Sequence, residues 1–245
     1  LIVKCVKVMN FKNVYTHSMK HESSIRNTHN FIKAILIKRF VQQNKRILDL
    51  GCGNGGDLLK LKHSKPSLYV GIDISPLCVQ TARERFSKVN MNCTCHLICS
   101  DFTQHDWNGY PPYDVINCQF AIQFAFQNER TANFTIEKIS HFLIEDGLFI
   151  GTLPIYDTKS YALVKTKVLG DVKEYEEYAV EENTLIDICL KNSLHIVTIE
   201  NFNTFFTHSY NKYFEIAKKM NAHVLPDPQN KVFVFQKRTL NHHHP

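Results

Sequence analysis

The sequence predicts an α/β fold in which helices cover both faces of a mostly parallel, seven-stranded sheet. Short β-branched and apolar runs alternate with longer segments of helical periodicity, as in repeated strand-helix units. The first such run, residues 46–50, stops in a glycine-rich turn whose backbone can approach a ligand closely. No repeat, low-complexity tract or linker interrupts the 245 residues. We therefore expect one domain over 1–245, with a basic arm and helix at 1–45 and an insertion at about 155–182.

The N-terminal part of the chain is strongly basic. Residues 1–46 hold ten Lys or Arg and a single acid, Glu22, whereas the whole chain has a net charge of +6. Such a surplus suits a phosphate-bearing partner, although a solvated helix face would also account for it. Residues 1–20 show no clean period. From Ser23 onward a helix is expected, because apolar residues recur every three or four positions: Phe31, Ile32, Ile35, Leu36 and Phe40.

The first strands of the sheet are marked by apolar runs and by the acids that follow them. A strand at 46–50 leads through the glycine-rich turn into a short leucine-rich helix at 58–61. A second strand at 68–73 ends on Asp73 at the distance along the chain where a carboxylate bonds a ribose diol in dinucleotide-type folds. The next helix, 76–86, begins at a Ser-Pro pair, which favours a capped first turn.

The same alternation continues through the middle of the chain. A third strand at 95–99 is followed by Asp101, and a fourth is expected at 113–120. A helix at 129–142 and an Asp-Gly turn then lead into a fifth strand at 148–153. After it we expect a helical segment at 161–169, an acidic tyrosine-bearing segment at 171–182, a helix at 183–191, a strand at 194–199, a helix at 203–220 and a last strand at 231–236.

Eight cysteines are present, and they are interpreted as small buried apolar residues of a reducing compartment. No secretory signal or bilayer-length apolar run is visible. The densest cysteine cluster, residues 93–99, lacks the paired spacing of a zinc site. Core packing is therefore favoured over metal binding, and no metal is expected.

Acids that follow neighbouring parallel strands meet at one edge of the sheet, which describes a pocket for an adenosine-bearing ligand. The turn lacks the Gly-Lys-Ser/Thr of nucleoside triphosphate sites. Asp57, near the start of the next helix, would also repel a pyrophosphate. S-adenosylmethionine fits better, because its sulfonium and amine are cationic, and the turn reads D-x-G-C-G-x-G-G. The alternative is a nicotinamide-binding fold.

Three ordered motifs resemble those of the mRNA cap guanine-N7 methyltransferases: residues 25–33, 48–58 and 119–126. Residues 151–154 and 177–180 resemble two further motifs of that family. The resemblance as a whole is close over residues 23–154 and weaker beyond them. The resemblance implies a Rossmann-like class I methyltransferase that moves a methyl group from S-adenosylmethionine to N7 of the GpppRNA cap guanine. It also implies a monomer in the nucleus that binds capped RNA, with other capping enzymes or RNA polymerase as further partners and no membrane.

The resemblance also assigns cofactor contacts. It places Lys33 on the methionine carboxylate, Asp73 on the ribose and Asp101 at the adenine amino group, which are chemically matched pairs. Asp57 would lie toward the sulfonium end. The full set is Lys33, Gly51, Gly53, Asp57, Asp73, Ile74, Asp101, Phe102, Gln119, Phe120, Ala121 and Phe124.

For the cap, the resemblance implies that Glu177 accepts both guanine N1–H and the exocyclic amine and favours the cation formed at N7. The alternative for Glu177 is one more charge in an acidic surface segment. Lys60 and Arg85 would meet triphosphate oxygens, and their alternative is a solvated helix face. The full set is His29, Asn30, Asn54, Lys60, Arg85, Gln123, Phe124, Pro154, Glu177 and Asn230.

Four of these positions depart from the family pattern. Asn54 replaces a lysine, Gln123 a histidine and Phe124 a tyrosine, while Asn230 stands where a tyrosine precedes the last strand. The segment 155–176 is also short for the family. These departures leave two other hypotheses open: a class I methyltransferase for another small molecule or RNA site, and a catalytically silent subunit of a capping complex. No acid–base catalytic residue is expected, because N7 loses no proton when it is methylated.

Overall fold

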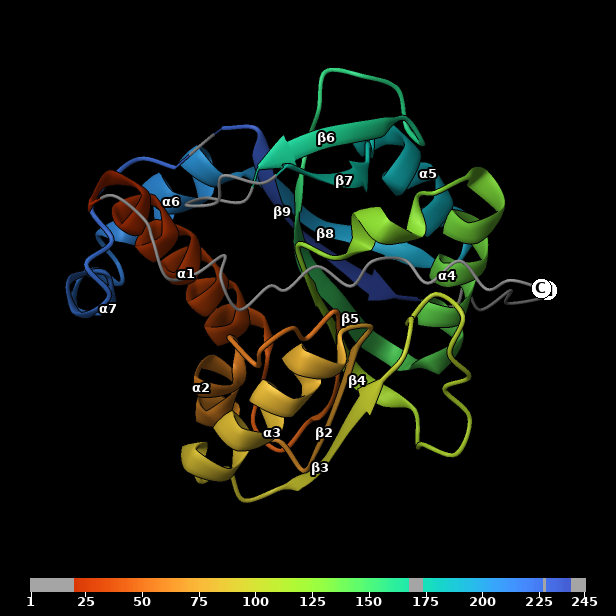
Figure 1. The fold of residues 1–245 in the computed structure, drawn as a ribbon, viewed down its shortest axis with the longest axis horizontal. Helices are drawn as coiled ribbons and strands as arrows, with labels where there is room; N and C mark the ends of the chain where they lie inside the picture. The colour runs from red at the N-terminus through yellow and green to blue at the C-terminus, as the bar shows by residue number, and fades with distance from the viewer. Residues whose placement is uncertain (1–19, 168–173, 227, 239–245) are drawn as a thin grey trace, which may run out of the picture.

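The computed structural model describes residues 20–167, 174–226 and 228–238. Its centre is a seven-stranded sheet of order β3-β2-β1-β4-β5-β9-β8 (Figure 1). The β1, β2, β3, β4 and β5 pairings are parallel, and β9 is antiparallel to both of its neighbours. The predicted mostly parallel, seven-stranded sheet is thus confirmed. The strands are β1 Arg46–Leu50, β2 Leu68–Asp73, β3 Thr94–Cys99, β4 Tyr113–Gln119, β5 Leu143–Pro154, β8 Leu194–Asn201 and β9 Asn230–Lys237.

Helices cover both faces of this sheet, because alternate strand residues point to opposite sides. Leu48 and Val70 belong to the core on one face, and Ile47 and Tyr69 belong to the core on the other. The first face is covered by α4 (Glu129–Phe142) and α5 (Glu182–Lys191), which lie at the right of Figure 1. The second face is covered by α1 Lys20–Phe40, α2 Leu58–Leu61, α3 Pro76–Val89, α6 Phe202–Tyr210 and α7 Phe214–Lys219.

The structure confirms the expected apolar stripe of α1, the cap of α3 and the bounds of α4. The apolar stripe of α1 is completely buried from Phe31 to Leu36 at the predicted positions. Ser75 caps α3 by accepting a hydrogen bond from the Cys78 amide at 3.3 Å, and Asn128 caps α4 in the same way. The α4 helix has the bounds that its periodicity predicts.

Two expected helices are wrong. Of the helix expected at 161–169, residues 168 and 169 lie outside the described residues, and Leu163–Lys167 is instead strand β6, antiparallel to β7 (Glu174–Tyr178) in a separate two-stranded sheet. Opposite charges face each other across this pair, as at Lys165 and Glu176, and such cross-strand pairs favour a hairpin. The single helix expected at 203–220 is two, α6 and α7, because the chain turns between them.

Two further expectations need correction. Strand β5 begins at Leu143 rather than 148, with Asp146 in a left-handed conformation (φ 61°) inside it. Cys99 is exposed rather than buried, because β3 is the edge strand of the sheet. Within the described ranges, no cluster of His, Cys, Asp and Glu could hold a metal ion. No helix in those ranges is long and apolar enough to cross a membrane.

Candidate functional site

The carboxyl ends of β1, β2, β3 and β4 meet at one edge of the sheet, and the glycine-rich turn after β1 lies there. Gly51 has φ 68°, and a Cβ added to it would lie 2.4 Å from the Cβ of Ala121, so only glycine fits. Gly53 is also left-handed, but a Cβ added there would meet nothing within 4 Å. At Gly51 the turn is therefore packed against Ala121, just after β4, and at Gly53 it borders open space.

Asp73, at the end of β2, ties the glycine-rich turn to the second strand. Its Oδ2 accepts a hydrogen bond from the Gly53 amide at 2.8 Å, and its Oδ1 accepts one from the Ser75 amide at 2.9 Å. Burial raises the pKa of Asp73. Ile74, beside it, is 58% exposed, which is unusual for isoleucine and leaves its side chain open to a ligand. Each carboxylate oxygen of Asp73 retains acceptor capacity, so a ribose diol could still bond it.

Asp101, after β3, shapes the next turn at this edge. Its Oδ1 accepts hydrogen bonds from the Thr103 amide (2.9 Å) and hydroxyl (2.7 Å), and its Oδ2 accepts one from the Gln104 amide nitrogen (3.3 Å). The ring of Phe102 is buried in the core on the α4 face. The turn therefore carries the predicted acid at the sheet edge and is anchored below by an aromatic ring.

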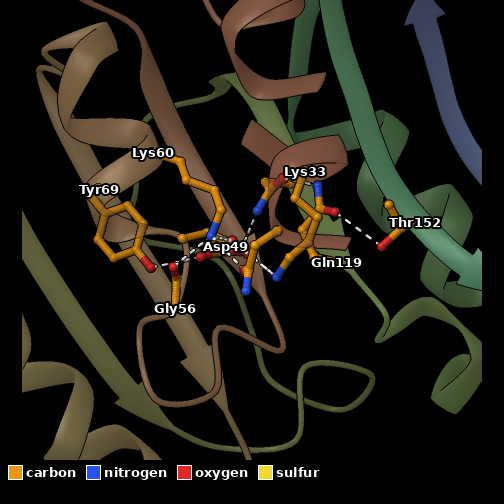
Figure 2. Close-up of polar contacts among 10 residues, drawn as sticks. Lys33, Asp49, Gly56, Lys60, Tyr69, Gln119 and Thr152 are labelled. Atoms are coloured by element: carbon orange, nitrogen blue, oxygen red, sulfur yellow. Dashed lines mark hydrogen bonds and ion pairs between the residues drawn. The ribbon is translucent and has the colours of Figure 1, made fainter. Parts of the chain in front are cut away.

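Lys33, Asp57 and Lys60 form one ionic cluster on the α1 side of the edge (Figure 2). The Asp57 Oδ1 lies 3.1 Å from the Lys33 Nζ and 2.8 Å from the Lys60 Nζ. Burial opposes ionisation of Asp57, but the two ammonium groups outweigh it and hold the pKa of Asp57 well below its ordinary value. Lys60 also donates to the Asn30 Oδ1 at 3.1 Å and to the Gly56 carbonyl at 2.9 Å. Lys33 and Asp57, which the resemblance assigns to the methyl donor, are thus in one cluster with Lys60, which it assigns to the cap.

A row of buried polar side chains runs across the sheet beneath this cluster (Figure 2). Asp49 accepts hydrogen bonds from the Tyr69 hydroxyl and from the Asn117 amide, both at 2.7 Å. Gln119 donates to Asn117 at 2.8 Å and accepts from the Thr152 hydroxyl at 3.1 Å. Burial raises the pKa of Asp49 to about 7.

Sequence reasoning missed most of this row, although a signal existed. Asp49 and Asn117 are register partners on neighbouring strands, and each is a polar residue between two buried apolar ones. Buried polar groups require partners, so this register predicts a bonded pair.

An aromatic group closes the α1 side of the site. His29 stacks on Phe120, with ring centroids 6.0 Å apart and planes at 27°, and its edge meets Phe202 at 5.1 Å. Phe120 has φ 55°, a strained conformation for a non-glycine residue, and its amide donates to the Thr152 carbonyl at 2.9 Å. The backbone after β4 is thereby turned toward the glycine-rich turn, where Ala121 contacts Gly51.

Glu177, on β7, is the centre of a second group of polar residues. It is 1% exposed, so the alternative of an exposed surface charge does not hold. Its carboxylate accepts hydrogen bonds from the Gln123 amide at 3.0 Å and from the Tyr156 hydroxyl. Burial raises the pKa of Glu177. Gln123 lies in the short helix η3 (Ile122–Ala125), which follows β4 of the main sheet. The segment after β4 and the two-stranded sheet therefore contribute to one group. Tyr156 was not singled out by its sequence.

The remaining predicted cap residues are dispersed around this group. Pro154 and Asn230 are register partners at the ends of β5 and β9, and both are half-buried. Asn54 lies half-buried in the glycine-rich turn, and Phe124 packs partly against the core. Arg85 is exposed on α3, as its helix-face alternative predicts.

Comparisons with known proteins agree on one family. A model described as the mRNA (guanine-N(7))-methyltransferase domain matches residues 10–167. The chain is 35% identical over 136 residues to the mRNA cap guanine-N(7) methyltransferase of Cryptococcus neoformans var. neoformans serotype D, covering 51% of this chain and 22% of that one. It is 29% identical over 202 residues to the protein of the same name from Eremothecium gossypii, covering 79% and 46%. The aligned part of the chain therefore spans less than half the length of these relatives.

The fold is shared more widely. A crystal structure of an S-adenosylmethionine-dependent methyltransferase from Clostridium acetobutylicum ATCC 824 superposes with a TM-score of 0.59 at 16% identity, covering 88% of this chain and 92% of that one. This similarity confirms the predicted Rossmann-like class I fold.

Proposed function

The chain belongs to the mRNA (guanine-N(7))-methyltransferase family, and from that membership we propose that it methylates N7 of the guanine cap on GpppRNA with S-adenosylmethionine as the methyl donor. In this proposal residues 1–245 act as one methyltransferase domain. The observation that carries it is the buried Glu177 carboxylate, held by Gln123 beside an edge built for an adenosine ligand. A guanine base has two adjacent donors, N1–H and the exocyclic amine, and a carboxylate can accept from both.

The residues at the sheet edge fit the methyl donor. Gly53 borders open space where a ligand can lie against the backbone. In this proposal Asp73 accepts the ribose hydroxyls, Asp101 accepts the adenine amine, and Lys33 bonds the methionine carboxylate. Once bound, S-adenosylmethionine supplies an electrophilic methyl group on a cationic sulfur. The Asp57 carboxylate, kept ionised by its two lysine neighbours, forms with them a cluster of net charge +1, which suits the methionine carboxylate of the donor.

The cap side needs no general base. Guanine N7 has a free lone pair and loses no proton, so this chain has to bind and orient the base and to exclude water. Glu177 holds the Watson–Crick edge and leaves N7 on the far side of the ring. Its negative charge also stabilises the positive charge that develops on the base. We assign the Phe124 ring to stacking on the guanine and Lys60 to the cap phosphates.

The test is methyl transfer by the purified protein. We expect label to move from S-adenosylmethionine to GpppRNA and not to m7GpppRNA. Glu177→Ala should abolish transfer and leave binding of S-adenosylhomocysteine intact, whereas Asp73→Ala should abolish both. Unchanged transfer by the Glu177 variant would remove the assignment of the cap pocket.

One alternative remains specific enough to test in the same assay. Gln123 and Phe124 differ from the family pattern at the heart of the cap group, and this favours a changed acceptor. GTP, GpppA and a panel of small amines therefore belong in the assay, where transfer to an amine alone would identify a different substrate. Cofactor binding without transfer to any acceptor would instead identify a silent subunit of a capping complex.

The proposal extends to partners and location. The basic residues of 1–46, other than Lys33 and the Asp114-bonded Lys45 and Arg46, would contact RNA phosphates beyond the cap. Family membership supports capped RNA as the partner and the nucleus as the site of action, with capping enzymes or RNA polymerase as further partners.

A further inference from the structure

Lys138, on α4, contacts the turn that follows β3. Its ammonium donates hydrogen bonds to the carbonyl oxygens of Phe102, Thr103 and His105, at 3.0, 3.3 and 2.9 Å. A lysine has three donors, and here all three are directed to one turn. Hydrogen bonds from a charged donor are about twice as strong as neutral ones, so this side chain is a strong restraint on the backbone of the turn.

The surroundings of Lys138 keep its ammonium in place. The Nζ lies 4.4 Å from the ring centroid of Trp107 and 5.4 Å from that of Phe134, which are cation–π distances. Trp107 is only 1% exposed, so the same side chain joins the end of the turn to the core. Burial lowers the pKa of Lys138 to about 8, while Asp101 and Asp106 favour its charged form.

The turn held by Lys138 is the one that begins at Asp101. The Asp101 carboxylate fixes its own turn by accepting from Thr103 and Gln104. Lys138 bonds carbonyl groups of the same turn from α4. Two side chains therefore stabilise the conformation of the turn: Asp101, within the turn, as a hydrogen-bond acceptor, and Lys138, from a distant part of the sequence, as a hydrogen-bond donor.

We propose that Lys138 is a positioning residue for the adenine side of the methyl-donor site, acting through the turn 101–105. This inference rests on the proposed function, because it takes the turn to be the one that receives adenine. Without the ammonium, three carbonyl groups lose their donor, and the turn is free to leave the conformation in which Asp101 faces the ligand. A ligand that needs one conformation binds more weakly in proportion to the population of that conformation.

The test compares two substitutions of Lys138 with a control on the same surface. Lys138→Met keeps the apolar stem and removes the charge, and Lys138→Arg keeps both charge and donors. Lys191→Met is the control, because Lys191 is exposed and lines the same shallow groove beside α4. Calorimetry with S-adenosylhomocysteine gives the affinity, and initial rates give kcat and the two KM values.

We expect Lys138→Met to bind S-adenosylhomocysteine about tenfold more weakly, from the loss of the preformed turn. The KM for S-adenosylmethionine should rise by a similar factor, while kcat and the KM for GpppRNA stay unchanged. Lys138→Arg should restore most of the affinity, and Lys191→Met should behave as the parent protein. A purely structural role would instead lower both affinities and kcat together.

The outcomes separate this inference from the proposed function. If the parent protein does not bind S-adenosylhomocysteine, the proposed function fails. If the parent protein binds it and Lys138→Met binds equally well, or if cap and donor affinities fall equally, Lys138 has no positioning role. If circular dichroism shows that Lys138→Met does not fold, Lys138→Gln takes its place, because its amide still has two donors. Its expected affinity for S-adenosylhomocysteine lies between that of the parent protein and the tenfold weaker affinity expected for Lys138→Met.

Discussion

The donor side and the cap side of the site are held in different ways. On the proposed donor side, both carboxylate oxygens of Asp73 accept hydrogen bonds from backbone amides, those of Gly53 and Ser75. On the cap side, Glu177 is held by the side chains of Gln123 and Tyr156, which come from other parts of the chain. Backbone donors are present whatever the residue type, whereas side-chain donors change with one substitution. The geometry at Asp73 is therefore fixed by the backbone, and the geometry at Glu177 depends on particular side chains.

The largest effect is expected from the donor side. Asp73→Asn should weaken binding of S-adenosylhomocysteine by about a hundredfold or more, because in the proposed site this residue bonds the ribose and also ties Gly53 to β2. Calorimetry measures it. Asp187→Asn, at an exposed acid on α5, is the control. Near-parental affinity in the Asp73 variant would show that the backbone of the turn needs no carboxylate.

A substitution on the cap side should separate the two sides. Glu177→Gln keeps the shape of the side chain and one acceptor but removes the charge, so kcat/KM for GpppRNA should fall about a hundredfold. Affinity for S-adenosylhomocysteine should stay within about twofold. Equal losses in both measurements would contradict the separation of the two sides.

Tyr156 offers a smaller change on the same side. Tyr156→Phe removes the hydroxyl that bonds Glu177 and leaves the ring. We expect the KM for GpppRNA to rise about threefold to tenfold, the range for one hydrogen bond. Initial-rate kinetics measure it, with Tyr110→Phe as a control on a tyrosine outside the cap group. A fall in KM would mean that the hydroxyl competes with the base for Glu177.

The donor side also predicts a pH effect on stability. The pKa of Asp49 is about 7 in the folded protein, above its unfolded value, so the folded state binds the extra proton between these two values. Stability should therefore fall as pH rises toward 7, by about 2 kcal/mol between pH 5 and pH 7 from this residue. Asp57, whose pKa is lowered, acts only at more acidic pH.

Denaturant unfolding at both pH values measures this effect. Asp49→Asn is close to the protonated form in shape and should remove most of the slope. If the unfolding free energy of Asp49→Asn falls with pH as steeply as that of the parent protein, a residue other than Asp49 is responsible for the effect.

The sequence predicted the elements that border the proposed donor side, because their signals are local. The bounds of α4, the end of β2 at Asp73 and the glycine-rich turn all follow from patterns a few residues long. Strand β6 was expected to be helical because the residues of 161–169 alone do not show that this segment pairs with β7. Tyr156 and Lys138 were missed for the same reason, since each acts on residues that only the fold brings near.

The two-stranded sheet has a consequence for how such a protein can change. In the described part of the chain, β6 and β7 pair with each other and with no strand of the main sheet. If the proposed function holds, substitutions in this hairpin can thus reshape the acceptor pocket without breaking a hydrogen bond of the seven-stranded sheet. Acceptor preference is then the adaptable property of the molecule, and directed evolution toward new methyl acceptors should begin in this hairpin rather than at the glycine-rich turn.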